Sequence, residues 1–338
     1  MKTKSILLGH GSGGRLSHNL IKDLFIRYFD NPILNLQGDS ALLNTDSNNI
    51  AFTTDSYVVD PVFFNGGNIG KLAICGTVND LAVSGAIPKY ISAGFIIEEG
   101  MAYDELEKIV SSMAIEAKKA NVQIVTGDTK VVDKNKCDKV FINTAGIGII
   151  EKKYLHISSG ENIKPGDKII INGTIADHGM SVMAARNFEN FKTDIKSDCA
   201  SLNHFIKEIL DTNARVKFIR DATRGGIASV LCEIAEKNKT GVEIDENNIP
   251  INDNVRGLCE LLGFDPFYVA NEGKIIIVVN PDDSEKVLEC MKNNEFGVNS
   301  SIIGEIVSEH KEKAILKTQI GGKRIIDMLA GEQLPRIC

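Results

Sequence analysis

Hydrophobic positions in the first half of the chain follow helix and strand periods in alternation. Residues 102–120 carry apolar side chains at every third or fourth position, which predicts an amphipathic helix. Shorter runs of β-branched and other apolar residues predict strands. The predicted helices of this half are 68–83 and 102–120, and the predicted strands are 50–54, 89–97, 121–126 and 140–150. This alternation predicts a compact α/β unit that ends near residue 159, where a loop and a Lys-Pro-Gly-Asp turn follow.

The second half shows the same alternation and no low-complexity segment or short repeat. Its predicted strands are 168–172, 242–244, 274–279 and 302–307, and its predicted helices are 180–187, 202–210, 226–237, 255–262 and 283–293. We therefore predict an α/β (α+β) chain of two domains, 1–159 and 160–325, followed by a mobile tail at 326–338.

The chain ends on a cysteine that follows two backbone breaks. The pattern at 329–334 predicts a short apolar helix that ends at Gly331, and Pro335 then favours extended backbone. We expect a tail that is either mobile or held extended in a groove, with a thiol on Cys338 that could be carried between active sites. A prenylation signal would need its cysteine fourth from the end, where this chain has Pro335.

Composition narrows the class of protein. The chain has 338 residues, of which 43% are hydrophobic and 25% charged, as in globular domains. It shows no apolar run near 18 residues and no signal-peptide pattern, so we expect a cytoplasmic protein without a membrane segment. A net charge of -7 argues against a nucleic-acid surface, whereas a nucleotide remains compatible if a divalent metal offsets its phosphates.

The seven cysteines are widely spaced and form no C-x-x-C pair, which argues against a zinc site and against a disulfide framework. Cys232 and Cys259 lie among apolar residues of predicted helices and are expected in the core. Only the position of Cys338 asks for a chemical role.

Four aspartates stand at strand ends or helix starts beside glycine, threonine or asparagine. They are Asp39, Asp55, Asp80 and Asp128, in the motifs Gly-Asp-Ser, Thr-Thr-Asp, Val-Asn-Asp and Thr-Gly-Asp-Thr-Lys. Strand-end aspartates of an α/β unit point into the crevice that binds ligands, and their oxygens suit Mg²⁺ together with phosphates. Each alone could equally be a turn or cap residue. The four together favour a nucleotide and metal site.

Three further motifs carry polar groups. The loop Gly-His-Gly-Ser-Gly-Gly-Arg at 9–15 could close its backbone N–H groups over phosphates or be an N-terminal linker, and it matches neither a Walker A loop nor a dinucleotide fingerprint. Asp221 and Arg224 precede a glycine pair that opens a helix. Glu272, just before an apolar strand, is either a base or part of an ordinary turn.

The motifs GDSALL, TTD, TVNDLA, TGDTK and DATRGG run in this order over nearly the whole chain. In this respect the chain resembles the ATP-binding superfamily of aminoimidazole ribonucleotide synthetase, selenophosphate synthetase and thiamine monophosphate kinase. With the loop at 9–15, the NEGK motif and the terminal PRIC, it most resembles the carbamoyl dehydratase branch that serves NiFe-hydrogenase maturation. Selenophosphate synthetases carry a reactive cysteine or selenocysteine in the N-terminal glycine-rich segment, where this chain has His10.

The resemblance implies a homodimer formed through the N-terminal sheets, with ATP near the interface. It also implies that the carbamoyltransferase HypF places a carbamoyl group on the sulfur of Cys338. The chain would then dehydrate this carboxamide to a thiocyanate and pass the cyano group to iron on a HypC–HypD complex. Two alternatives remain open, a small-molecule kinase of the thiamine monophosphate type and a non-catalytic carrier that a nucleotide switches.

On this resemblance each motif residue receives an expected role. The expected metal and phosphate ligands are Asp39, Asp55, Asp80, Asp128 and, as an addition, Asp221; Asn79, Gly127 and Thr129 complete the expected nucleotide site. Lys130 is the expected phosphate clamp or proton carrier, Glu272 the base for the amide nitrogen, and Arg224 its electrostatic partner. His178 either assists or is a structural histidine.

Overall fold

The computed structural model describes residues 14–20, 22, 41–44, 49–187, 193–331, 334 and 336–338. Asp39, most of the glycine-rich loop at 9–15 and Pro335 lie outside the described residues, so their predicted roles stay predictions.

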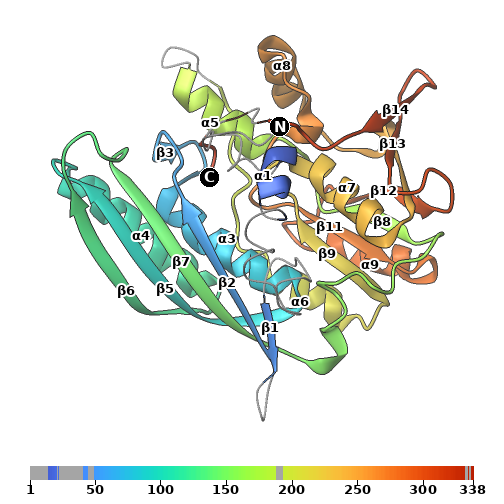
Figure 1. Cartoon of the computed structure of the whole chain (residues 1–338), viewed down its shortest axis with the longest axis horizontal. Coiled ribbons are helices and arrows are strands. Elements are labelled where there is room, and N and C mark those ends of the chain that lie inside the picture. Colours follow the sequence, from blue (N-terminus) through green and yellow to red (C-terminus); the bar gives the residue numbers. More distant parts are fainter. Residues whose placement is uncertain are drawn as a thin grey trace.

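The first half forms a five-stranded sheet with the order β1-β2-β7-β5-β6. Its strands are β1 (Ala41–Asn44), β2 (Asn49–Tyr57), β5 (Ala86–Glu98), β6 (Gln123–Val132) and β7 (Val140–Ile150). Buried and more exposed residues alternate along β7, as expected for a strand with one covered face. All neighbouring strands pair antiparallel except β5 and β6. Helices α3 (Ile69–Val83) and α4 (Tyr103–Lys119) lie on one side of this sheet (Figure 1).

Helix α3 is the central element of the molecule. The side chain of Asn68 caps it by accepting from the amides of Gly70 and Lys71. Almost every residue of the helix is buried, because one side packs on the first sheet and α4 while the other meets α6 and β9 of the second half. A short hairpin of β3 (Phe63–Phe64) and β4 (Gly67–Asn68) leads into it.

The second half forms a seven-stranded sheet with the order β14-β13-β10-β12-β8-β11-β9. Its strands are β8 (Lys168–Ile171), β9 (Val216–Asp221), β10 (Gly241–Asp245), β11 (Ile275–Val279), β12 (Ser301–Val307), β13 (Ala314–Lys317) and β14 (Lys323–Ile326). Alternate residues of β8 and β11 contribute to two separate cores. Ile169 and Ile276 pack with α7 (Gly226–Asn238), whereas Ile170 and Ile277 pack with α6 (Asn203–Asp211) and α9 (Ser284–Lys292).

The remaining elements connect these layers. They are α1 (Arg15–Leu20), α5 (Asp177–Asn187), α8 (Asp253–Leu262) and the short 3₁₀ helices η4 (Lys152–Tyr154), η5 (Glu246–Asn248), η6 (Pro266–Tyr268) and η7 (Pro281–Asp283). In the part of the chain that the structure describes, no helix combines the length and apolar composition of a membrane span.

Every helix and strand predicted for 50–307 is present, and most ends shift by at most about three residues. The strand predicted at 121–126 continues to Val132, so the expectation that Asp128 stands at a strand end is wrong. The prediction of a short apolar helix before Gly331 is wrong, because residues 327–331 are irregular. There Met328 is buried beside Ile326, and the carbonyl of Leu329 accepts the amide of Arg15. The chain is thus anchored through residue 329, and Cys232 and Cys259 are buried as predicted.

Candidate active site at the seam between the two halves

Strand β2 and helix α3 carry the first two acidic residues of the site. Thr53, Asp55 and Tyr57 point from the same face of β2 toward α3. The hydroxyl of Thr53 donates to Asp80 Oδ2 at 2.6 Å, and the hydroxyl of Tyr57 donates to Asp55 Oδ2 at 3.2 Å. Burial, and then the charge of Asp55, raises the pKa of Tyr57 well above its usual range, so Tyr57 remains a donor.

The second half contributes an acid and an arginine from one strand–helix junction. Strand β9 ends at Asp221, and α7 begins at Gly226. Gly225 and Gly226 both have left-handed backbone, with φ of 77° and 60°, which explains why this position holds a glycine pair. Arg224 lies at this turn.

Glu272 lies next to Asp221. It precedes β11, which pairs with β9 so that Ile275 is opposite Asp221. The side chain of Glu272 is buried, and its backbone amide donates to Asp198. Asp198 also accepts the amide of Gly273 and the ammonium of Lys274, and so holds the loop in place.

These acidic groups perturb one another. Burial raises the pKa of Glu272 well above its usual range, and the charges of Asp221, Asp198 and Asp55 raise it further. Burial likewise raises the pKa of Asp221 to about 6, although Arg220 opposes the shift. Asp55 from the first half and Asp221 and Glu272 from the second therefore belong to one electrostatic cluster.

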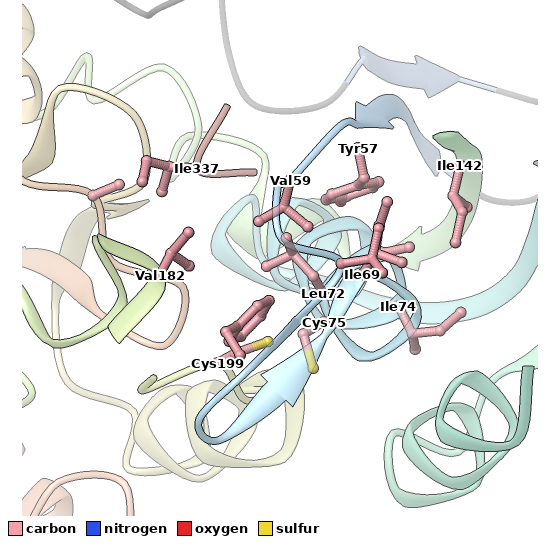
Figure 2. Packing of buried hydrophobic residues seen from close by; sticks show 14 of the residues in the cluster. Tyr57, Val59, Ile69, Leu72, Ile74, Cys75, Ile142, Val182, Cys199 and Ile337 are labelled. Atoms are coloured by element: carbon pink, nitrogen blue, oxygen red, sulfur yellow. The ribbon is translucent and has the colours of Figure 1, made fainter. Parts of the chain in front are cut away.

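The end of the chain reaches this cluster. The amide of Val58 donates to Cys338 O at 3.1 Å, and the amide of Asp60 donates to Arg336 O at 3.2 Å, so the tail runs antiparallel to the segment that follows β2. Ile337 is buried in the cluster that contains Val59 and Val182 (Figure 2). The negative charge of Cys338 is the largest of the effects that raise the pKa of Arg224. The structure thus brings Cys338, Arg224, Asp55 and Glu272 together.

Residues 336–338 pack against the segment that follows β2. The prediction of extended backbone is wrong at Arg336, whose φ of 54° is left-handed. The guanidinium of Arg336 donates to the carbonyl of Val58 and pairs with Asp138, and both contacts hold the bend.

His178 contacts the tail. Its ring is fully buried at the start of α5, with Nε2 3.0 Å from the carbonyl oxygen of Ile337 and Nδ1 2.8 Å from the hydroxyl of Ser197. Burial lowers the pKa of His178 and keeps the ring neutral near pH 7. Because a carbonyl can only accept, Nε2 carries the proton.

Asn79 bridges the two halves. Its amide donates to the carbonyls of Ala200 and Glu272, and its oxygen accepts the amide of Leu202. Its expected contact with a nucleotide stays a prediction.

The TGDTK motif lies on the edge strand, away from this cluster. Asp55 pairs with Thr144, Thr144 with Ala93, and Ala93 with Gly127, so three strand spacings, about 14 Å, separate Asp55 from Gly127. Asp128 and Lys130 form an exposed ion pair of 3.1 Å, and Thr129 lies between them in β6. A side chain at Gly127 would lie 2.1 Å from the carbonyl oxygen of Ala93, which accounts for the glycine.

A magnesium ion fits this donor set. No three potential ligands converge on one point among the described residues. Mg²⁺, however, needs only one or two carboxylates when phosphates and water complete its shell. The partly exposed carboxylates of Asp55 and Asp80 meet that need, and a cation beside them would offset the repulsion with Asp221 and Glu272.

Tyr57, Asp198 and Arg186 are site residues that the sequence analysis missed. The alternation of exposed and buried residues along β2 could have indicated Tyr57. Asp198 lies in irregular chain without a motif, and the contacts of Arg186 come from the end of the chain, so no local pattern signals either residue.

The structure has two sheets, with the acidic residues Asp55, Asp221 and Glu272 clustered where the two halves of the chain meet. This arrangement defines a class of two-domain proteins. Residues 37–150 match the family model for the AIR synthase related protein, N-terminal domain, and residues 164–317 match the model for its C-terminal domain. The chain is 44% identical to the carbamoyl dehydratase HypE of Rhodobacter capsulatus, over 100% of this chain and 99% of that protein.

Solved structures agree. A crystal structure of a HypE–HypF complex contains a chain with a TM-score of 0.86 and 47% identity, covering 92% of this chain and 99% of that one. A HypE crystallised with ATP has a TM-score of 0.82 and 45% identity, covering 99% and 100%. The chain therefore belongs to the carbamoyl dehydratase HypE family, as its motifs indicated.

Proposed function

We propose that this protein is an ATP-dependent carbamoyl dehydratase of NiFe-hydrogenase maturation, which converts an S-carboxamide on its own Cys338 into a thiocyanate. The observation that carries the proposal is the docking of the terminal cysteine beside Arg224, in a cluster with Asp55 and Glu272. The family supports the reaction type, and the ATP complex of a relative supports the cosubstrate.

The reaction balances as a dehydration coupled to ATP. The carboxamide oxygen attacks the γ-phosphorus, the bond to ADP breaks, and one N–H proton leaves, which gives an O-phosphorylated imidate. Loss of phosphate with the second N–H proton then leaves the S–C≡N group. Phosphorylation is needed because the amide oxygen is otherwise a very poor leaving group.

Glu272 is the base for the nitrogen protons in this scheme. Its raised pKa gives the carboxylate more affinity for a proton than an exposed glutamate has. Arg224, whose pKa the charge of Cys338 raises, would supply positive charge to the developing phosphate. Asp221, whose pKa burial raises to about 6, is the second group that could hold a proton.

Asp55 and Asp80, with Asp39 and Asp221, would hold Mg²⁺, which supplies charge to offset the transferred phosphate. We assign residues 1–159 to ATP binding and dimerisation and 160–325 to the second domain. Asp128 and Lys130 lie three strands from Asp55 in one chain, so we place them, with Gly127 and Thr129, in a nucleotide site completed by a second copy. Asn79 would support the site from the seam, where it joins the two halves.

HypF is the proposed carbamoyl donor, because a relative forms a complex with it. A HypC–HypD complex is the proposed acceptor of the cyano group, and the cytoplasm is the proposed compartment.

Intact mass spectrometry tests the proposal. After incubation with HypF, carbamoyl phosphate and ATP, the wild type should gain one carboxamide on the C-terminal peptide and then lose one water, with ADP formed. Cys338→Ala should do neither. A kinase would keep phosphorylating a free substrate without Cys338, and a carrier would form no ADP that depends on carbamoylation.

A further inference from the structure

The backbone oxygens of residues 336, 337 and 338 all accept hydrogen bonds from groups elsewhere in the chain. His178 Nε2 donates to the carbonyl of Ile337 at 3.0 Å, and Arg186 donates to the carbonyl of Arg336 at 2.9 Å. The third acceptor, a carboxylate oxygen of Cys338, takes a hydrogen bond from the amide of Val58. None of these contacts involves a tail side chain, so the donors recognise the path of the tail backbone.

His178 is fixed as a donor by its surroundings. The amide of Cys199 donates to the hydroxyl of Ser197, which leaves that hydroxyl to donate its own proton to Nδ1 of His178. The ring packs edge-to-face on Phe64, with centroids 5.3 Å apart. A fully buried ring with both nitrogens paired cannot rotate toward the reacting atoms without losing these contacts.

Arg186 ties the same tail to the other half of the molecule. Its guanidinium donates to the carbonyl of Asp60 and to the carbonyl of Arg336, and so bridges the segment after β2 and the tail. This segment directly follows Asp55 and Tyr57. A shift of the tail by one residue would break the pairs of Val58 with Cys338 and of Asp60 with Arg336, and would move Cys338 relative to Arg224.

We propose that His178 and Arg186 are positioning residues that set the register of the tail and hold the Cys338 sulfur at the reaction site. They act on the tail and not on the reacting atoms, so His178 is neither a catalytic residue nor only a core residue. We call His178 and Arg186 together the tail clamp. An effect of the clamp on catalysis rests on the proposed function, whereas its effect on the exposure of the Cys338 thiol does not.

The test measures the rate at which iodoacetamide alkylates Cys338 in the full chain, read on the C-terminal peptide by mass spectrometry. His178→Phe keeps an aromatic ring and removes the donor, and Arg186→Met removes the bridge. Each should speed alkylation of Cys338 about tenfold. His178→Phe leaves the buried carbonyl of Ile337 without its donor, and Arg186→Met removes the bridge between the carbonyls of Asp60 and Arg336. His178→Gln, whose amide can donate, should restore most of the protection.

His156→Phe is the matched control. A ring nitrogen of His156 lies 3.0 Å from the carbonyl oxygen of Val216, and this contact does not involve the tail. The variant should leave the alkylation of Cys338 unchanged. In single turnovers with a carbamoylated tail, His178→Phe should slow dehydration about tenfold while HypF loads Cys338 at least as fast as in the wild type.

Wild-type alkylation rates in both His178→Phe and Arg186→Met would overturn the clamp. So would faster alkylation in His156→Phe to the same degree, since the effect would then be general loosening. If the clamp variants behave as expected but the wild type never dehydrates its carboxamide, the proposed function fails and the clamp stands.

Discussion

Asp221 and Glu272 are two buried carboxyl groups with raised pKa values, and the charge of Asp221 raises the pKa of Glu272 further. Such a pair is costly for folding and useful for catalysis, because a base that works near neutral pH must hold a proton more tightly than an exposed carboxylate. Their placement at the end of β9 and before β11 follows from the pairing of these strands.

Because a buried charge on Asp221 costs folding free energy, we predict that Asp221→Asn stabilises the ligand-free protein at high pH. The pKa of Asp221 is about 6 in the folded protein, above its ordinary value of 3.8, so the folded state binds the proton more tightly. Stability due to this group is therefore present below about pH 4 and lost as pH rises through about 6. At pH 8 the variant should gain up to about 3 kcal/mol in urea unfolding, and near pH 4 almost nothing.

Asp128→Asn is the control for this comparison, because Asp128 is an exposed member of an ion pair and should change stability by less than about 1 kcal/mol at either pH. A gain for Asp221→Asn of the same size at pH 4 and pH 8 would contradict the argument from its charge.

Glu272→Gln separates loading of the tail from dehydration. Carbamoylation by HypF should proceed, whereas removal of the nitrogen protons should slow by at least about 100-fold. Mass spectrometry should then find the carboxamide persisting with ATP present. In the wild type the rate should rise with pH through the raised pKa of Glu272, and this dependence should be absent from the variant. The control is Glu285→Gln, at the exposed start of α9, which should behave like the wild type. A normal yield of thiocyanate in Glu272→Gln would exclude Glu272 as the base.

Local motifs marked Asp55, Asp80, Asp221, Arg224 and Glu272 as candidates. The expected placement at strand ends and helix starts is wrong for Asp55, which lies within β2, and for Asp80, which lies within α3. Sequence left the role of His178 open, because its contacts with Ser197 and Ile337 depend on chain 19 and 159 residues away. Burial and distant partners, which decide such roles, leave no local pattern.

At the scale of elements, the turn into α7 fixes Arg224 in the site. Gly226 has left-handed backbone, and a Cβ atom there would lie 2.4 Å from the carbonyl oxygen of Phe267. Gly226→Ala should therefore destabilise the protein by more than about 2 kcal/mol and reduce dehydration, because α7 and Arg224 must move. Chemical denaturation measures the first effect and single-turnover kinetics the second.

Gly257→Ala provides the comparison within a helix. No atom lies within 4 Å of a Cβ built at Gly257 in α8, and its backbone is right-handed helix, so alanine should be neutral or stabilise by roughly 0.5–1 kcal/mol. Equal stability of the two variants would mean that the tight turn before α7 is not needed.

The strands that sequence failed to predict show what an apolar pattern misses. Strand β9 carries Lys217 and Arg220, which interrupt its apolar run. Lys217 pairs at 2.7 Å with the buried Asp167, and Arg220 pairs with Glu233 of α7. Long elements with a clear period, such as α4, were predictable, because their own residues decide their structure. Short strands such as β9 depend on partners elsewhere in the chain.

At the scale of the whole molecule, the site exists only where the halves meet. Asp55 and Asp80 come from the first, Asp221, Arg224 and Glu272 from the second, and the tail lies across both. Asn79 and Arg186 hold this arrangement by donating to the backbone carbonyls of Ala200 and Arg336. Sequence could predict the two halves, but not the face by which they meet.

An apolar patch on the outer face of the first sheet indicates where two copies of the protein would pair. Phe52, Ile147 and Tyr90 are direct neighbours across β2, β7 and β5, on the side opposite α3, and Tyr90 is 49% exposed. A contiguous apolar patch of this kind marks an interface. We expect a homodimer through this face, and Tyr90→Glu should weaken dimerisation by at least about 100-fold, because a carboxylate would be buried without a partner.

Sedimentation velocity over a range of concentrations measures this effect. The control is Ile320→Glu, since Ile320 is 95% exposed in the turn between β13 and β14 and should leave the dimer intact. If the dimer completes the nucleotide site with Asp128 and Lys130, the monomeric Tyr90→Glu variant should also lose ATP turnover. Its tail should stay docked, so Cys338 should remain protected from alkylation. A wild type that sediments as a monomer at micromolar concentration would contradict this assembly, and a monomeric variant with full ATP turnover would place Asp128 and Lys130 outside the site.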